Sequence, residues 1–212
     1  MKENKTIEVN SIIQSPTIPS AFEVSDEEKI DKIAKHFKTI METLGLDLSD
    51  DSLKETPKRV AKMYVSEIFS GLNPKNKPEV TLFKNNYGYN QMLVEKNISV
   101  YSMCEHHFVP IIGRAHVAYI ANGKVIGLSK IHRMVKYFSQ RPQVQERLTR
   151  QIMENLKQTL NIDDVAVVID ARHMCVECRG VEDVTSSTIT SAISGQFQED
   201  STRSEFMRFI DM

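Results

Sequence analysis

The sequence predicts an α+β fold in which an antiparallel sheet carries two helices on one face. From about residue 92 the chain gives, in order, two strand-like segments, two helical segments and two further strand-like segments. Amphipathic helical segments precede this unit. Such an order gathers the helices on one side of the sheet. Its outer strands would be exposed edges, which joining the sheets of several subunits into a barrel would remove.

The composition is that of an ordinary globular protein, because 41% of the 212 residues are hydrophobic and 26% are charged. The formal net charge of -1 gives no basic field, so nucleic acid is not an expected partner. No apolar run approaches the roughly 20 residues that cross a bilayer, and Met1 to Asn10 is too polar for a signal peptide. Three cysteines cannot all pair within one chain. We therefore expect a cytoplasmic protein with no membrane partner and with thiols available to a metal.

The first part of the chain is expected to contain an arm followed by helices. Residues 1–24 show no sustained apolar period and are expected to form a flexible N-terminal arm. A helical region is expected over 25–85. It opens at Ser25-Asp26-Glu27-Glu28, which has the form of a capping box. A second helix opens at Thr56-Pro57, a cap residue followed by proline. Two glycines are placed to end these helices: Gly45 and Gly71.

Residues 86–212 are expected to form the domain that holds the sheet. Strands rich in Val, Ile and Tyr or Thr are expected over four ranges: 92–103, 108–120, 165–171 and 184–192. A helix with one apolar stripe is expected over 129–140, and a longer one is expected to follow a break at Arg141-Pro142 and to run to about residue 160. Asn122-Gly123 gives a tight-turn signal. Thr202-Arg203-Ser204-Glu205 has the form of a capping box for a short C-terminal helix.

Two short segments concentrate the metal-binding residue types. Cys104-Glu105-His106-His107 follows the first strand, and Arg172-His173-Met174-Cys175 follows the third. A thiolate and an imidazole three residues apart, as in Cys104 and His107, can close on one ion, and Cys175 can complete a Cys2His set for zinc. Three protein ligands leave the fourth zinc position to water, which then ionises near neutral pH. This pattern indicates a hydrolytic centre.

A closed structural site is the alternative on spacing alone. Cys178 lies three residues after Cys175, so it would convert the Cys2His set into a Cys3His set with no open position. The neighbouring imidazoles favour the catalytic interpretation. His106 and His173 are not required as ligands, and imidazoles beside a zinc-bound water are suited to proton transfer near neutral pH.

Five motifs occur in a fixed order between residue 56 and the C-terminal helix. They are Thr56-Pro57-Lys58-Arg59-Val60-Ala61, Cys104-Glu105-His106-His107-Phe108, Gly127-Leu128-Ser129-Lys130, Ser139-Gln140-Arg141-Pro142-Gln143-Val144-Gln145-Glu146-Arg147-Leu148-Thr149, and His173-Met174-Cys175 followed by Arg179-Gly180. Together they resemble the GTP cyclohydrolase I family, the first enzymes of folate and pterin biosynthesis. One such motif would be weak evidence, whereas this series in this order is highly specific.

The resemblance implies a tunnelling fold, in which residues 86–212 form a catalytic domain with an antiparallel ββααββ unit. The sheets of neighbouring subunits join into a barrel. Family members are decamers of two face-to-face pentamers with active sites shared between subunits, so a homo-oligomer is expected. The family reaction is the zinc-dependent hydrolysis of GTP at C8, which releases formate and gives 7,8-dihydroneopterin triphosphate. That reaction is the first step of tetrahydrofolate and pterin biosynthesis.

The resemblance also implies roles for individual residues. The ligands of Zn²⁺ are Cys104, His107 and Cys175, and the groups that move protons are His106 and His173. Zn²⁺ would activate the attacking water. The two histidines would donate and accept protons as the imidazole ring of the purine opens and formate leaves.

Further residues are implied to hold the substrate. Glu146 can accept from the guanine N1–H and the 2-amino group together, and Gln145 is a second purine contact. Ser129 is implied to be a catalytic residue that lies near the ribose during its rearrangement. Four basic residues are implied to meet the triphosphate: Lys130, Arg133, Arg179 and Arg59. The first two are three residues apart on one helix face, and the last two are expected to come from different subunits.

Two alternatives stay open at this point. Another zinc hydrolase of a purine or pyrimidine is suggested by Cys175-x-x-Cys178, although the H-x-E and P-C-x-x-C pattern of zinc deaminases is absent. A non-enzymatic protein with a structural Cys3His zinc is the second. Cys178 departs from the family pattern and is a bystander thiol, an alternative ligand or an oxidation liability. His116 and His132 are taken as structural.

Overall fold

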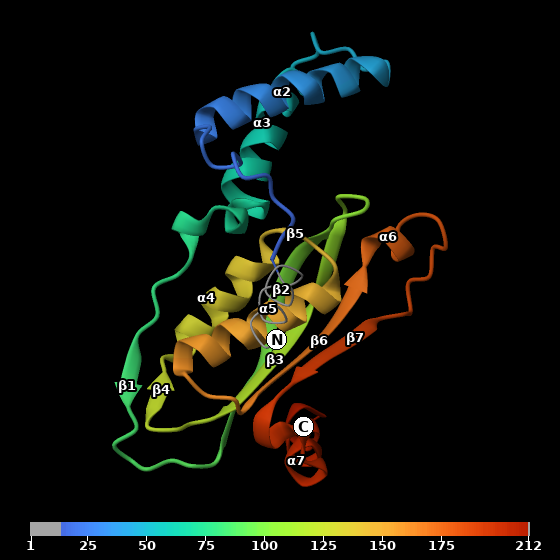
Figure 1. The fold of residues 1–212 in the computed structure, drawn as a ribbon. Coiled ribbons are helices and arrows are strands. Elements are labelled where there is room, and N and C mark those ends of the chain that lie inside the picture. The colour runs from blue at the N-terminus through green and yellow to red at the C-terminus, as the bar shows by residue number, and fades with distance from the viewer. Residues whose placement is uncertain (1–13, 212) are drawn as a thin grey trace, which may run out of the picture.

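The computed structural model describes residues 14–211, so residues 1–13 of the predicted arm lie outside the described residues. It has an α+β architecture built on one five-stranded sheet (Figure 1). Two helices cover one face of the sheet, the C-terminal helix lies against the other, and the N-terminal helices lie beyond one end. The predicted α+β class is confirmed. Within the described residues, no helix is long and apolar enough to span a membrane.

The first N-terminal helix begins and ends where the sequence predicts. α2 (Asp26–Thr43) packs on α3 (Thr56–Met63). The hydroxyl of Ser25 accepts a hydrogen bond from the backbone N–H of Glu28 at 3.2 Å, which is half of the predicted capping box. Gly45 follows the helix with φ of +81°, the left-handed conformation on which helices commonly end.

The second helix differs from the prediction at both ends. Thr56 is its first helical residue rather than its cap, and the cap position belongs to Glu55, whose side chain makes no capping bond. Three short turns continue the chain: η1 (Tyr64–Ile68, π-helical), η2 (Ser70–Leu72) and η3 (Pro74–Asn76). Gly71 lies inside η2 and does not end α3. It allows a close approach, because a Cβ at this position would lie 2.0 Å from the carbonyl oxygen of Tyr137.

The main sheet has the strand order β5-β2-β3-β6-β7. The strands are β2 (Met92–Cys104), β3 (Pro110–Ile120), β5 (Pro142–Gln143), β6 (Val165–His173) and β7 (Thr188–Ile193). The pairs β2–β3, β3–β6 and β6–β7 are antiparallel. The short strand β5 pairs in parallel with the end of β2, opposite Met103 and Cys104. The last residues of β2 are therefore held between two neighbours.

A second, two-stranded sheet was not predicted. It consists of β1 (Leu82–Lys84) and β4 (Lys124–Ile126), which pair in antiparallel register. The predicted turn at Asn122-Gly123 connects β3 to β4, and Gly123 has φ of +74° as such a turn requires. The remaining elements are α4 (Leu128–Ser139), α5 (Gln145–Leu160), α6 (Met174–Glu177), η4 (Gly195–Gln198) and α7 (Asp200–Asp211).

The side chains of β6 divide between two cores. Val165, Val167 and Ile169 are buried in the large core under α4 and α5, as the period of two in a strand requires. The alternate residues Ala166 and Val168 are buried on the opposite face, against Phe197 and Phe206 of the C-terminal segment. Because both faces are covered, this strand reads as a continuous apolar run in the sequence.

Three predicted boundaries are wrong. The last strand begins at Thr188 rather than at residue 184, because the side chain of Asp183 accepts from Thr185 and forms a turn. The second sheet-covering helix begins at Gln145, since residues 142–143 form β5. The C-terminal helix begins at Asp200, before the predicted capping box at 202–205.

Candidate functional site

The loop after β2 presents a cysteine and two histidines at one end of the sheet. The backbone N–H of Cys104 donates to the carbonyl of Val109 at 2.8 Å, and the N–H of Phe108 donates back to the carbonyl of Cys104 at 2.9 Å. In this tight loop Cys104 is 5% exposed, with Nδ1 of His106 at 3.7 Å and Nδ1 of His107 at 3.9 Å from its sulfur. The two imidazoles therefore converge on one thiol.

The second segment delivers Cys175 to the same place. Cys175 lies in α6, the single turn that follows β6. The ligand atoms of Cys104, His107 and Cys175 all lie within 4.8 Å of one another. Burial raises the pKa of the Cys175 thiol, and the adjacent Cys104 thiol acts in the same direction. The three residues that the sequence indicates as metal ligands thus form one compact donor set.

Cys178 lies outside this donor set. Its side chain is exposed, and its sulfur donates to the carbonyl oxygen of Met174 at 2.8 Å. Among residues 14–211, the compact group consists of Cys104, His107 and Cys175 and does not include Cys178. This placement favours three protein ligands over a closed set of four.

The role of Glu105, which sequence reasoning left unassigned, is to tie the loop to α5. Its carboxylate forms an ion pair with the guanidinium of Arg147, and its backbone N–H donates to the carbonyl of Gln143 at 3.0 Å. Arg147 in turn donates to the side-chain oxygen of Gln143 at 3.0 Å and to the carbonyl of Pro142 at 3.2 Å. The loop that carries Cys104 and His107, β5 and the start of α5 are therefore joined through one arginine.

Phe108 anchors the other side of the loop. It has φ of +54°, a conformation that a bulky residue adopts only when its surroundings hold it. Its ring lies 5.2 Å from that of Phe69 and 6.4 Å from that of Tyr64, between centroids. These aromatic contacts connect the loop to the N-terminal helical region. The sequence gives Phe108 no role beyond its place in a motif, directly after His107.

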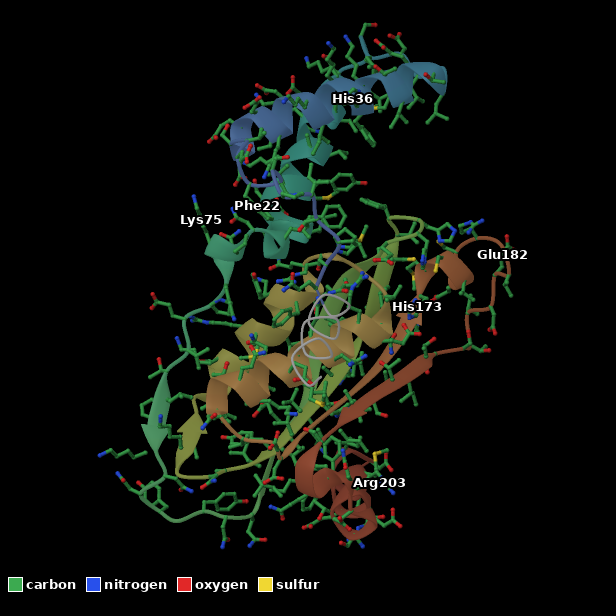
Figure 2. All side chains as sticks on the ribbon, in the orientation of Figure 1. Phe22, His36, Lys75, His173, Glu182 and Arg203 are labelled. Carbon is green, nitrogen blue, oxygen red and sulfur yellow. The ribbon has the colours of Figure 1, made fainter. Side chains whose placement is uncertain are left out.

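His173 is held in one tautomer by Gln145. Nε2 of the imidazole lies 2.8 Å from Oε1 of Gln145, whose own amide nitrogen donates to the carbonyls of Ile169 at 3.0 Å and Thr188 at 2.7 Å. Since these bonds make Oε1 an acceptor, Nε2 of His173 must carry the hydrogen and Nδ1 keeps its lone pair. Figure 2 shows His173 at the end of β6, below α6. Gln145 is 1% exposed and has both amide donors in use within the chain.

Three further predicted residues lie near this end of the sheet. Burial lowers the pKa of His173, and the carboxylate of Glu146 opposes that shift, so Glu146 is close enough to act on the imidazole. Arg179 is exposed and acts electrostatically on Cys175. The side chain of His106 is 64% exposed. Metal donors, imidazoles, a carboxylate and a guanidinium therefore share one region.

Four predicted substrate residues are not brought to this region within one chain. Ser129, Lys130 and Arg133 lie near the start of α4, beside β4, whereas α6 lies at the opposite end of the sheet (Figure 1). Arg59 lies on α3 and is exposed. In residues 14–211 no hydrogen bond or ion pair links any of the four to the metal donor set.

The two histidines taken as structural are placed as follows. His132 lies on α4, where its Nε2 lies 2.9 Å from a carboxylate oxygen of Glu95. His116 is 9% exposed on the sheet face away from α4 and α5, and its Nδ1 has no hydrogen-bond partner. Neither belongs to the donor set.

An α+β chain that brings two thiols and an imidazole to one point, with a second imidazole fixed as a proton acceptor beside them, defines a candidate metal-dependent enzyme. A profile described as GTP cyclohydrolase I matches residues 33–211. The chain belongs to the GTP cyclohydrolase I family.

Relatives named GTP cyclohydrolase 1 cover nearly the whole chain. That of Flavobacterium johnsoniae is 57% identical over 203 residues, which is 96% of this chain and 91% of the relative. That of Vibrio vulnificus is 53% identical over 196 residues, which is 92% of this chain and 89% of the relative. Among solved structures, the apo form of an archaeosine synthase QueF-Like matches 49% of this chain and 93% of its own, with 20% identity and a TM-score of 0.42. A likeness at that level carries no functional information.

Proposed function

We propose that this chain catalyses the GTP cyclohydrolase I reaction, in which GTP and water give 7,8-dihydroneopterin triphosphate and formate. This is the first step of tetrahydrofolate and pterin biosynthesis. The observation that carries the proposal is the donor set of Cys104, His107 and Cys175 beside His173, in a chain of this family. The three free thiols fit a reducing compartment, so a cytoplasmic location is part of the proposal.

The donor set fits zinc. Two thiols and one imidazole are the ligand types that zinc prefers, and three protein ligands are the number found in catalytic zinc sites. Cys104, His107 and Cys175 would hold the ion. When bound, zinc supplies an activated water near neutral pH for hydrolysis.

The chain's own residues would handle protons and the substrate. His173 is oriented by Gln145 so that its free Nδ1 can accept a proton. His106, exposed beside Cys104, is the second proton carrier. Glu146 would accept from the guanine N1–H and 2-amino group. Gln145 is also predicted to contact the purine. Its side chain is buried and already binds His173, so this contact stays a prediction.

The positions of the residues predicted to bind phosphate lead us to propose a site shared between subunits. Ser129, Lys130 and Arg133 lie near the start of α4, away from the metal donor set of the same chain. If the sheets of neighbouring subunits join edge to edge into a barrel, one subunit's α4 can meet another's metal donor set. We therefore propose a tunnelling fold with a ββααββ unit, assembled as a decamer of two pentamers. Arg179 and Arg59 would complete the triphosphate site.

The proposal includes the division of the chain into an N-terminal arm at 1–24, a helical region at 25–85 and a catalytic domain at 86–212.

The test of function is incubation of the zinc-loaded, assembled protein with GTP while formate and pterin fluorescence are measured. Formation of both products supports the proposal, and absence of both contradicts it.

A further inference from the structure

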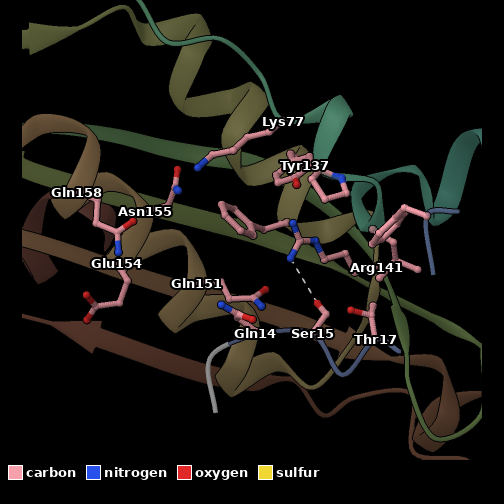
Figure 3. A pocket seen from close by; sticks show the side chains of 14 residues that line it. Gln14, Ser15, Thr17, Lys77, Tyr137, Arg141, Gln151, Glu154, Asn155 and Gln158 are labelled. Carbon is pink, nitrogen blue, oxygen red and sulfur yellow. Dashed lines mark hydrogen bonds between the residues drawn. The ribbon is translucent and has the colours of Figure 1, made fainter. Parts of the chain in front are cut away.

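A cavity outside the candidate active site contains a buried arginine without an anionic partner. The cavity has a volume of about 330 Å³ and lies between α4, α5 and the segment around Ser15 (Figure 3). This size falls within the range of about 300–1,000 Å³ typical of small-molecule sites. None of the residues proposed above for metal, proton transfer or substrate lines it.

Arg141 is the charged centre of this cavity. Its side chain is 9% exposed, and its guanidinium lies 4.5 Å from the ring centroid of Tyr137 and 4.7 Å from that of Phe138. Nη1 donates to the hydroxyl of Ser15 at 3.3 Å, whereas Nε is buried without a hydrogen-bond partner. In the described part of the chain no carboxylate forms an ion pair with Arg141. A buried cation with an unpaired N–H is costly, and an anion in the cavity would pair it.

Asn155 contributes an unpaired hydrogen-bond acceptor to the cavity, whereas Arg141 contributes an unpaired donor. It is 8% exposed, and its Oδ1 is a buried acceptor without a hydrogen-bond partner. Figure 3 shows Arg141 in the middle of the lining side chains, with Asn155 to the left of its guanidinium and Ser15 below it. The carboxylate of Glu154 also lines the cavity. This part of the wall accepts hydrogen bonds and would be satisfied by an N–H donor.

Among residues 14–211, three buried side-chain atoms have no hydrogen-bond partner, and two of them, Nε of Arg141 and Oδ1 of Asn155, belong to residues that line this cavity. Buried polar atoms without a hydrogen-bond partner are rare in folded proteins, so each one calls for a physical explanation. We propose that this cavity binds a small zwitterion, whose carboxylate or other oxyanion meets Arg141 and whose N–H donor group meets Asn155 and Glu154. Phe22 and Leu72 add apolar surface to the lining of the cavity.

The experiment measures binding of ω-amino acids to the full-length, assembled protein by calorimetry. Three probes carry a carboxylate and an ammonium group at increasing separation: 4-aminobutanoate, 5-aminopentanoate and 6-aminohexanoate. Acetate carries only the carboxylate, and butylamine carries only the ammonium group. Carboxylates are used because a phosphate probe would also bind the proposed triphosphate residues. We expect saturable binding of at least one ω-amino acid at one site per chain, with affinity at least about tenfold above that of acetate or butylamine, since both ends are then paired.

Variants assign the binding to the cavity. Arg141→Gln and Asn155→Leu should each weaken binding by about tenfold or more, because each removes one partner of a buried polar group. Arg150→Gln, which changes an exposed arginine of α5 that does not line the cavity, should leave binding unchanged. If Arg141→Gln does not fold, Asn155→Leu decides the question. Lack of saturable binding of every probe, or equal affinity in wild type and Asn155→Leu, would overturn the proposal.

Discussion

Nε2 of His173 lies 2.8 Å from Oε1 of Gln145, and this contact sets which nitrogen of the imidazole can accept a proton. Gln145 opens α5, whereas His173 ends β6, so the contact joins a helix start to a strand end beside the metal donor set. The sequence alone places both residues in motifs but gives no sign that they touch.

Replacing Gln145 by Leu tests whether this contact positions His173. We expect kcat for GTP to fall by about tenfold or more, because the imidazole loses the acceptor that fixes its tautomer, and bound zinc to be unchanged. His173→Ala is the reference, with an expected loss of about 10²–10⁴ in kcat. The steady-state measurement separates two roles. A raised KM with unchanged kcat would instead identify Gln145 as a purine contact and contradict the positioning role.

The metal content of cysteine variants tests the three-ligand set. Cys178→Ser should bind one zinc per chain as the wild type does, since the Cys178 thiol is exposed and bonded to the carbonyl of Met174. Cys175→Ser should lose most of the metal. Atomic absorption on proteins purified in parallel gives the stoichiometry. Loss of zinc from Cys178→Ser would support a closed structural site and remove the open position.

Mixing two inactive variants tests the shared site. His173→Ala disables the metal end of one chain, and Lys130→Ala disables the start of α4. If each site takes its metal end from one subunit and its phosphate end from another, random mixed oligomers should regain about a quarter of wild-type turnover. Coexpression of differently tagged chains and purification through both tags provides the sample. Turnover no higher than that of either variant alone would place both ends in the same chain.

His116 predicts a loss of stability in acid. Burial lowers the pKa of His116, with Lys96 and Arg114 acting in the same direction and Asp170 and Asp211 opposing it. The imidazole of His116 therefore binds a proton more readily in the unfolded state than in the folded state. This histidine contributes stability above its unfolded pKa of about 6.5, and that contribution is lost as pH falls through the lower folded value.

Thermal unfolding between pH 5 and pH 8 measures this effect. The decline of the unfolding temperature on acidification should be smaller in His116→Gln than in wild type. His36→Gln, at an exposed position of α2, is the matched control and should follow the wild type. Parallel pH profiles of His116→Gln and wild type would show that His116 is not the group that titrates.

Much of the fold was predictable because local patterns and burial agree. Ser25 and Gly45 bound α2, and the apolar run of β6 marks a strand covered on both faces. Other features depend on contacts between distant segments. β5 is a strand only because it pairs with the end of β2, and Gly71 is needed only because Tyr137 approaches it.

The candidate site shows the same division. Cys104, His107 and Cys175 were predictable because metal-binding residue types are few and cluster in two segments. The pairing of Glu105 with Arg147 was not, since either charge alone resembles an ordinary surface residue. Long-range partners decide such roles, and they carry no local signal.

The central claim is that the donor set of Cys104, His107 and Cys175 serves the hydrolysis of GTP. The most direct measurement is the yield of formate and of dihydroneopterin triphosphate from GTP, by zinc-loaded wild type and by Cys104→Ser, before and after chelation and return of zinc. We predict equal amounts of the two products from the wild type, loss on chelation, recovery with zinc, and no turnover by Cys104→Ser. Wild-type protein that holds zinc and yields neither product, or Cys104→Ser that matches the wild type, would contradict the account.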